Sequence, residues 1–85
     1  MLSFCHTIKA QYGLHARIAG DLVQQTKRFQ SDIHIRKNER IADAKKLMDI
    51  MTLRAKCGDS VEVEFKGSDE QSAMDAIKSF FEKFL

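Results

Sequence analysis

The spacing of the hydrophobic residues changes repeatedly along this chain, and that change limits the fold more than any other feature. Residues 2–8 and 60–66 alternate between apolar and polar side chains, as half-buried strands do. Residues 16–29 and the segment after Gly67 place apolar residues three and four apart, which is typical of amphipathic helices. The chain has no proline and only four glycines, and no linker is present. The change between the two spacings predicts a fold that mixes strands and helices.

The middle of the chain predicts a hairpin followed by a short helix. Residues 32–37 alternate again, which indicates a strand. Asn38 lies in the predicted turn, because asparagine tolerates a positive φ, and residues 41–42 belong to the returning strand. Asp43 is then expected to cap a short helix that includes residues 47–53.

The last part of the chain predicts a capped helix. Ser68 and Gln71 fit a capping box, in which the serine side chain accepts an amide of the first turn and the glutamine side chain accepts the serine amide. The apolar stripe of the helix that follows consists of Ala73, Met74, Ile77, Phe80, Phe81 and Phe84. This stripe is expected to cover the sheet.

The predicted order of elements is β-α-β-β-α-β-α, in a single domain of residues 1–85. Each predicted helix has one apolar side, so the helices are expected to cover one face of the sheet and to leave the other face wet. The predicted fold class is α+β: an open-faced two-layer sandwich with a four-stranded antiparallel sheet and three helices on one face. A domain of this size buries roughly 60–65% of its unfolded surface, which leaves room for one modest core.

Charge and composition argue against several classes of protein. The net charge is only +2, from 14 basic and 12 acidic side chains, which does not favour nucleic-acid binding. No apolar run is long enough to cross a membrane and the first residues lack a secretory pattern, so a cytoplasmic protein is expected. Cys5 and Cys57 form no CxxC pair and are expected to be buried or unused thiols in a reducing compartment.

The segment from Gly13 to Arg17 is the best candidate for chemistry, because it joins the end of a predicted strand to the start of a helix. The first turn of a helix leaves amides such as those of Ala16 and Ile18 without intrahelical acceptors, and the helix dipole favours an anion there. His15 can hold a phosphoryl group against these amides, and Arg17 can place a cation beside its oxygens. The local sequence alone also allows His15 to be an ordinary solvated or capping residue.

Other kinds of site fit the sequence less well. A hydrolase needs a nucleophile with an orienting acid, and no such pattern is present. A metal site needs several ligands at suitable spacing, whereas His6, His15 and His34 are scattered. A small RNA-binding domain is a further alternative, but the predicted strands lack paired exposed aromatic residues. No glycine-rich nucleotide loop occurs, so a phosphoryl group would have to arrive from another protein.

The segment Gly13-Leu14-His15-Ala16-Arg17 resembles the active-site motif of HPr, the histidine-containing phosphocarrier of the bacterial sugar phosphotransferase system. The resemblance extends over nearly the whole chain, and the predicted order of elements is also that of the family. Further positions with similar residues are Asp32, Asn38, Lys45, Leu47, Met48, Met51, Gly67 and Ser68.

The resemblance implies that His15 accepts a phosphoryl group on its Nδ1 atom, and that Arg17 and the amides of Ala16 and Ile18 steady this group. The donor would be enzyme I, itself charged by phosphoenolpyruvate, and the acceptors would be sugar-specific A components. Such a protein is a phosphoryl carrier rather than an enzyme and uses no cofactor or metal. A monomer is expected, with no nucleic-acid partner and no membrane insertion.

The chain departs from the family pattern at four positions. Ile18 replaces the proline that usually follows the active-site arginine, which restores an amide donor and loosens the first turn. Lys46 stands where Gram-positive members carry a regulatory serine, so phosphorylation at that place is not expected. Asp49 and Arg54 stand where many relatives have glycine. These departures leave open a regulatory adaptor, or a pathway-specific paralogue, that uses phosphorylation of His15 as a switch.

The resemblance also implies a partner-docking surface on the first helix and the short helix. Its expected members are Gly20, Gln24, Lys27, Lys46, Leu47, Met48 and Met51. Leu47 and Met48 are adjacent and cannot both face inward, so at least one of them is expected at the surface, whereas Met51 is expected to fill the core. The lysines here and Arg54 are either an ordinary solvated face or, beside an apolar patch, a charge that steers acidic partners.

Overall fold

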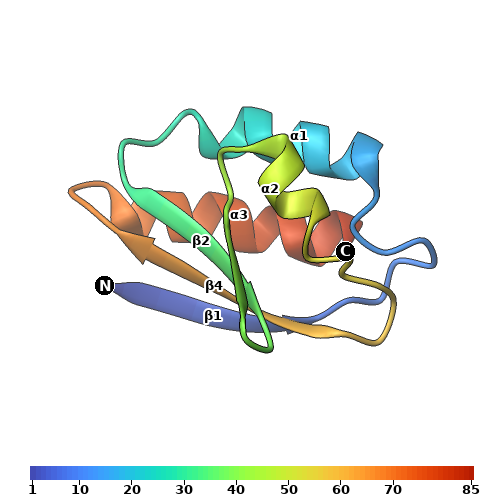
Figure 1. Ribbon diagram of the computed structural model, residues 1–85. Coiled ribbons are helices and arrows are strands. Elements are labelled where there is room, and N and C mark those ends of the chain that lie inside the picture. The colour runs from blue at the N-terminus through green and yellow to red at the C-terminus, as the bar shows by residue number, and fades with distance from the viewer.

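The computed structural model describes residues 1–85 as two layers, a sheet with helices on one side (Figure 1). The strands are β1 (Leu2–Thr7), β2 (Asp32–Lys37), β3 (Arg40–Asp43) and β4 (Ser60–Lys66). The helices are α1 (Ala16–Thr26), α2 (Leu47–Met51) and α3 (Glu70–Phe84). The predicted order of elements and the open-faced α+β sandwich are therefore confirmed. No helix is long and apolar enough to cross a membrane.

The four strands form one antiparallel sheet in the order β1-β4-β2-β3. Strand β4 lies inside the sheet, where Val63 is opposite Phe4 of β1 on one side and Ile35 of β2 on the other. Val61 and Phe65, two residues away along β4, are buried as Val63 is, because side chains on the same face of a strand recur every second residue. The sheet is thus built around the segment with the clearest alternation.

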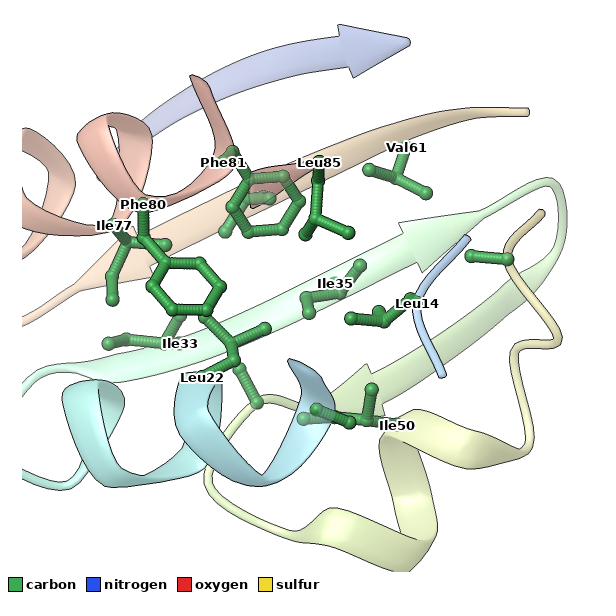
Figure 2. Close-up of a cluster of buried hydrophobic side chains, with 14 of the residues drawn as sticks. Leu14, Leu22, Ile33, Ile35, Ile50, Val61, Ile77, Phe80, Phe81 and Leu85 are labelled. Atoms are coloured by element: carbon green, nitrogen blue, oxygen red, sulfur yellow. The ribbon is translucent and has the colours of Figure 1, made fainter. Parts of the chain in front are cut away.

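The core lies between the sheet and the helices, and Figure 2 shows side chains of both layers meeting there. The residues that meet include Leu22, Ile33, Ile35, Ile50, Val61, Ile77, Phe80 and Phe81. Burying each of these large side chains contributes roughly 1.5–3 kcal/mol. Phe84, which was expected in the same stripe, is an exception, since 51% of it is exposed and its ring lies against Phe80 with centroids 5.0 Å apart.

The other face of the sheet is polar and partly exposed, as predicted. Arg36 of β2 lies 3.8 Å from a carboxylate oxygen of Glu62 and 3.6 Å from one of Glu64 on β4. Such exposed pairs contribute little to stability. Cys5 faces this side of β1, and Cys57 lies in a loop. Both thiols are free and exposed, so of the two expected states, buried or unused, the structure excludes burial. Cys5 is outward because it alternates with the inward-facing side chains of β1.

Helix α1 is shorter than the predicted span of residues 16–29, because it ends at Thr26. The Thr26 side chain is buried and donates a hydrogen bond to the carbonyl of Ala44 at 2.7 Å. The chain then leaves the helix through a turn in which the amide of Phe29 bonds the carbonyl of Thr26 at 3.2 Å. The helix end is therefore set by a contact with the segment after β3.

The predicted cap of the short helix is wrong. Asp43 is the last residue of β3, where it pairs with His34 of β2, and the residue that precedes α2 is Lys46. The Asp43 carboxylate instead accepts the amide of Lys45 at 2.9 Å, which forms a tight turn between strand and helix. The pairing of β2 with β3 continues one residue beyond the predicted strand, and that is why the aspartate belongs to the sheet.

The predicted capping box before the last helix is also wrong, by one residue. Asp69 rather than Ser68 precedes α3, and Glu70 rather than Gln71 accepts the amide of Gly67, at 3.1 Å. The Asp69 carboxylate accepts the amides of Gln30 and Ser31, both at 2.9 Å, and the hydroxyl of Ser31. Helix α3 therefore begins directly after Asp69, because the contacts of this carboxylate with Gln30 and Ser31 fix the position of its first residue.

Candidate functional site

His15 lies directly before the first residue of α1. Its backbone is extended, with φ −82° and ψ 174°, and its carbonyl accepts the amide of Ala19 at 2.8 Å. The half-buried side chain makes no capping hydrogen bond to the helix. The imidazole is therefore not used to cap α1, and its ring nitrogens are available for a reaction.

The first turn of α1 offers hydrogen-bond donors to an anion. The amides of Ala16, Arg17 and Ile18 donate to no acceptor in the protein, and no acidic side chain lies in this turn. The Arg17 side chain is exposed and lies within 4.0 Å of no carboxylate. The partial positive charge of the helix start and the guanidinium can therefore act on the same anion without a competing carboxylate.

Gly13 shapes the approach of the chain to His15. Its φ is +64°, in the left-handed region that glycine adopts at little cost. A Cβ atom on Gly13 would lie 2.5 Å from the carbonyl oxygen of Ala55 and 2.8 Å from the Cα atom of Lys56. The amide of Leu14 donates to the same Ala55 oxygen at 2.9 Å. The segment before His15 is thus pressed against the backbone of residues 55–56.

Sequence reasoning missed two backbone groups that hold this segment. One is the carbonyl of Ala55. The other is the Leu85 oxygen, which accepts the amides of Lys9 at 2.5 Å and Ala10 at 3.3 Å. A backbone oxygen has no side-chain signature, so no sequence signal could have identified either group.

Asp59 closes the loop that supports Gly13. Its carboxylate accepts the amide of Lys56 at 2.9 Å and lies 3.0 Å from the ammonium of Lys37. The Lys56 amide, followed by the Lys37 ammonium, holds the pKa of Asp59 below its ordinary value of 3.8. The carboxylate therefore stays ionised at neutral pH and keeps the two hydrogen-bond donors in place.

The residues predicted to dock a partner lie on α1, on α2 or directly before α2, and the two helices pack against each other. Gln24, Lys27, Lys46, Leu47 and Met48 are exposed, whereas Gly20 and Met51 are half-buried. Both Leu47 (38% exposed) and Met48 (74%) reach the surface, and Met51 packs against the core as expected. The structure thus brings the set together on one pair of helices, and its docking role stays a prediction.

The residues that depart from the family pattern have distinct environments. The Asp49 carboxylate accepts the amide of Asp43 at 2.7 Å and so ties α2 to the end of β3. Arg54 has a φ of +50°, which a glycine would adopt with less strain. Ile18 lies in the first turn of α1, where its side chain is buried in the core and its amide has no acceptor.

The three histidines do not converge. His6 packs edge-on against the ring of Phe81, with centroids 5.4 Å apart, and its Nε2 atom is buried without a hydrogen-bond partner. His34 lies on β2 and His15 at the start of α1. No group of three or more histidine, cysteine, aspartate or glutamate side chains is placed to hold a metal ion.

Comparison with known proteins agrees with this site. Residues 2–83 match the family PTS-HPr, described as the PTS HPr component phosphorylation site. The chain is 43% identical over 77 residues to the phosphocarrier protein HPr of Cupriavidus necator, which covers 91% of this chain and 86% of that protein. It is 40% identical over 76 residues to the HPr-like protein Crh of Halalkalibacterium halodurans, which covers 89% of this chain and 90% of that protein.

A solved structure with a similar fold is HPr-C-His from Thermoanaerobacter tengcongensis. Its TM-score with this chain is 0.93 at 35% sequence identity, and the match covers 98% of this chain and 93% of that one. The motif around His15, the sandwich fold and the relatives therefore agree, and the chain belongs to the HPr family of phosphocarrier proteins of the bacterial phosphotransferase system.

Proposed function

We propose that this protein accepts a phosphoryl group on His15 from enzyme I, itself charged by phosphoenolpyruvate, and passes it to sugar-specific A components in the cytoplasm. The observation that carries this proposal is the free imidazole of His15 beside three amides without acceptors and the unpaired Arg17. Relatives named phosphocarrier protein HPr support it. The protein acts as a carrier, and its partners supply the rest of the catalytic groups.

In the proposed transfer, the lone pair of the His15 Nδ1 atom attacks phosphorus while the bond from phosphorus to the donor breaks. The amides of Ala16 and Ile18 and the guanidinium of Arg17 then face the phosphoryl oxygens. Passing the group on reverses these events, since the bond from phosphorus to His15 breaks as the acceptor attacks. Such a reaction requires alignment of two groups more than any covalent assistance.

The test is phosphorylation by phosphoenolpyruvate and purified enzyme I, followed by intact mass measurement. We expect an acid-labile gain of about 80 Da, the mass of one phosphoryl group, because phosphohistidine hydrolyses in acid. His15→Ala, which removes the acceptor while leaving a fold that does not depend on this half-buried ring, should show no gain. Circular dichroism of the variant checks that the fold is retained.

A regulatory adaptor is the second candidate function, and the 40% identity to an HPr-like protein named Crh supports it. If enzyme I is active on another carrier but adds no mass to this protein, the carrier proposal fails and the adaptor becomes the better account. The presence of both His15 and Arg17 favours the carrier. The monomeric state stays a prediction, which size-exclusion chromatography can test.

A further inference from the structure

An open hollow of about 670 Å³ lies where the end of β1 meets the end of α3, two elements that pack against each other. One wall comes from residues 5–7 and 9–10, and the other comes from residues 82–85. Neither His15 nor Arg17 is among the residues that line the hollow. The hollow is therefore separate from the proposed phosphorylation site, and the proposed function gives its residues no role.

His6, one of the residues that line the hollow, has an unpaired nitrogen. Its side chain lies on the inward face of β1, with its ring edge-on to that of Phe81 at a centroid distance of 5.4 Å. The Nε2 atom is buried and has no hydrogen-bond partner in the protein. Buried polar atoms nearly always have a partner, because losing the hydrogen bonds to water without replacement costs free energy. A molecule bound in the hollow can supply the missing partner.

Each wall of the hollow has a lysine whose charge is unpaired. Lys9 belongs to the segment after β1, and Lys83 belongs to the last turn of α3. Both side chains are exposed, and neither ammonium lies within 4.0 Å of a carboxylate. Glu82 is the only acidic side chain in the lining, and the Leu85 oxygen already accepts the amides of Lys9 and Ala10. The two ammonium groups are therefore free to attract an anion.

Phe84 gives the hollow an aromatic surface. This residue was expected in the buried stripe of α3, yet 51% of it is exposed, and its ring contacts that of Phe80 with centroids 5.0 Å apart. Aromatic rings pack well on one another in offset-stacked or edge-to-face arrangements. The ring of a bound molecule can therefore pack against Phe84 while an acidic group of the same molecule contacts the lysines.

Other kinds of ligand fit the hollow less well. A metal ion needs several ligands, and no group of three or more histidine, cysteine, aspartate or glutamate side chains is placed to hold one. A purely apolar molecule would leave both ammonium groups and the His6 Nε2 atom without a partner. A small inorganic anion would leave the ring of Phe84 uncovered. An acid with an aromatic ring satisfies all three features.

We propose that the hollow binds a small organic acid that has an aromatic ring. Its acidic group lies between Lys9 and Lys83 and accepts a hydrogen bond from the Nε2 atom of His6, and its ring packs against Phe84. A carboxylate and a phosphate monoester both have this chemistry. The inference does not depend on the proposed function, because the binding requires no transfer of a phosphoryl group.

The first experiment titrates phenyl phosphate, benzoate and inorganic phosphate into ¹⁵N-labelled protein and follows the amide signals. We expect at least one aromatic acid to shift the signals of residues 5–10 and 82–85, with a Kd about tenfold or more below that of inorganic phosphate at these residues. The aromatic acid with the lower Kd shows whether the hollow prefers a carboxylate or a phosphate monoester. Equal Kd values for the aromatic acids and inorganic phosphate, or no shift at these residues, would overturn the proposal.

The second experiment removes the two charges of the hollow, with Lys9→Ala and Lys83→Ala in one variant. The matched control is Lys66→Ala with Lys78→Ala, which removes two exposed lysines elsewhere. We expect the Kd of the tighter aromatic acid to rise about tenfold or more in the first variant and to stay within about twofold in the control. The same change in both variants would show a response to net charge alone and would contradict a specific site.

The third experiment tests the imidazole and the aromatic surface. His6→Phe removes the Nε2 atom while keeping a ring beside Phe81, and we expect the Kd of the aromatic acid to rise about fivefold, because one hydrogen bond is lost. Thermal unfolding checks that this variant is folded. Phe84→Ala changes an exposed side chain and should remove most of the preference for an aromatic acid over inorganic phosphate, even if His6→Phe does not fold.

The site of binding decides between the hollow and the start of α1, which also attracts anions. Signal shifts confined to residues 15–18 would mean that the probes bind only at the proposed phosphorylation site, and the inference would be wrong. An unchanged Kd in Phe84→Ala would contradict it equally. Shifts at residues 5–10 and 82–85 that persist in His15→Ala would support it.

Discussion

Helices α1 and α3 begin in opposite chemical surroundings. At the start of α3, the Glu70 carboxylate accepts the amide of Gly67, and the Asp69 carboxylate accepts the amides of the loop at Gln30 and Ser31. At the start of α1, by contrast, the first turn has no acidic side chain, although in both helices first-turn amides such as those of Arg17 and Gln71 have no acceptor. The carboxylates of Asp69 and Glu70 thus place at the start of α3 the negative charge that a helix start attracts, and the start of α1 has no such charge.

The backbones before the two helices are nevertheless similar. Gly13 before α1 lies against Ala55, and Gly67 before α3 lies against Ser31, where a Cβ atom would be 2.6 Å from the Ser31 Cα. Each helix start is thus fixed by close contact with a distant segment. The difference in side chains teaches that the start of α3 carries its own negative charge and contacts a distant loop. The start of α1 has no negative charge of its own, as the proposed binding of a phosphoryl group there requires.

The strongest test of this contrast gives α1 the acidic first turn that α3 already has. Arg17→Glu places a carboxylate where the phosphoryl group is expected, so repulsion and the lost cation act together. We expect the rate of phosphorylation by enzyme I to fall by about a hundredfold or more. Quench-flow measurement of phosphoprotein formation gives this rate, and an unchanged rate would remove the anion site from the start of α1.

A milder change removes only the cation. Arg17→Ala should slow phosphoryl transfer on the order of tenfold, because the amides of the first turn remain to stabilise the moving phosphoryl group. The same rate measurement applies, with thermal unfolding to confirm that the exposed side chain contributes little to the fold. A rate equal to that of the parent protein would mean that Arg17 has no part in the transfer.

The close contact before α1 predicts a loss of stability when Gly13 acquires a side chain. Gly13→Ala combines a φ of +64° with a clash against the Ala55 oxygen, and should cost roughly 2–3 kcal/mol. Gly20→Ala is the matched control, since no atom lies within 4 Å of its Cβ position and it lies inside α1. That control should gain about 0.5–1 kcal/mol.

Urea unfolding of the two glycine variants measures these free energies. Similar values for Gly13→Ala and Gly20→Ala would show that the segment before His15 is free to move away from Ala55. In that event the contact with Ala55 does not fix the position of His15. The start of α1 would then differ from the start of α3, where Gly67 lies against Ser31.

The carboxylate at the start of α3 predicts a dependence of stability on pH. The Ser31 hydroxyl, followed by the Gln30 amide, holds the pKa of Asp69 below its ordinary value of 3.8. Because the folded pKa is lower than the unfolded one, this stabilisation is complete above about pH 5 and is lost as the pH falls through the folded pKa. Asp69→Asn should therefore lower stability at neutral pH and reduce the loss on acidification.

Urea midpoints between about pH 7 and pH 3 test the role of Asp69. Asp21→Asn removes an exposed carboxylate of α1 that accepts no hydrogen bond, and so controls for the change in net charge. If Asp69→Asn and the control lose stability in parallel on acidification, the carboxylate is not the acid-sensitive joint that its contacts indicate.

Side-chain periodicity predicted the elements well because it reflects which face of each element is buried. Strand β2 has the predicted bounds, and β4 runs over the predicted residues 60–66. Helix boundaries were predicted less well: α1 ends at Thr26, and α3 is preceded by Asp69 rather than by Ser68. Both boundaries depend on hydrogen bonds to residues more than a dozen positions away, which a local pattern does not contain.

The candidate functional site was likewise predicted only in part. The position of His15 and Arg17 at the start of a helix was predicted, because the spacing of hydrophobic residues changes directly after Gly13. The Ala55 carbonyl that holds Leu14 was not predicted. By itself the sequence determined the elements and their buried faces, because these follow from neighbours along the chain, and it predicted the reactive residues. Only the tertiary structure decided where helices begin and which distant backbones meet, because those contacts form when the sheet and helices pack together.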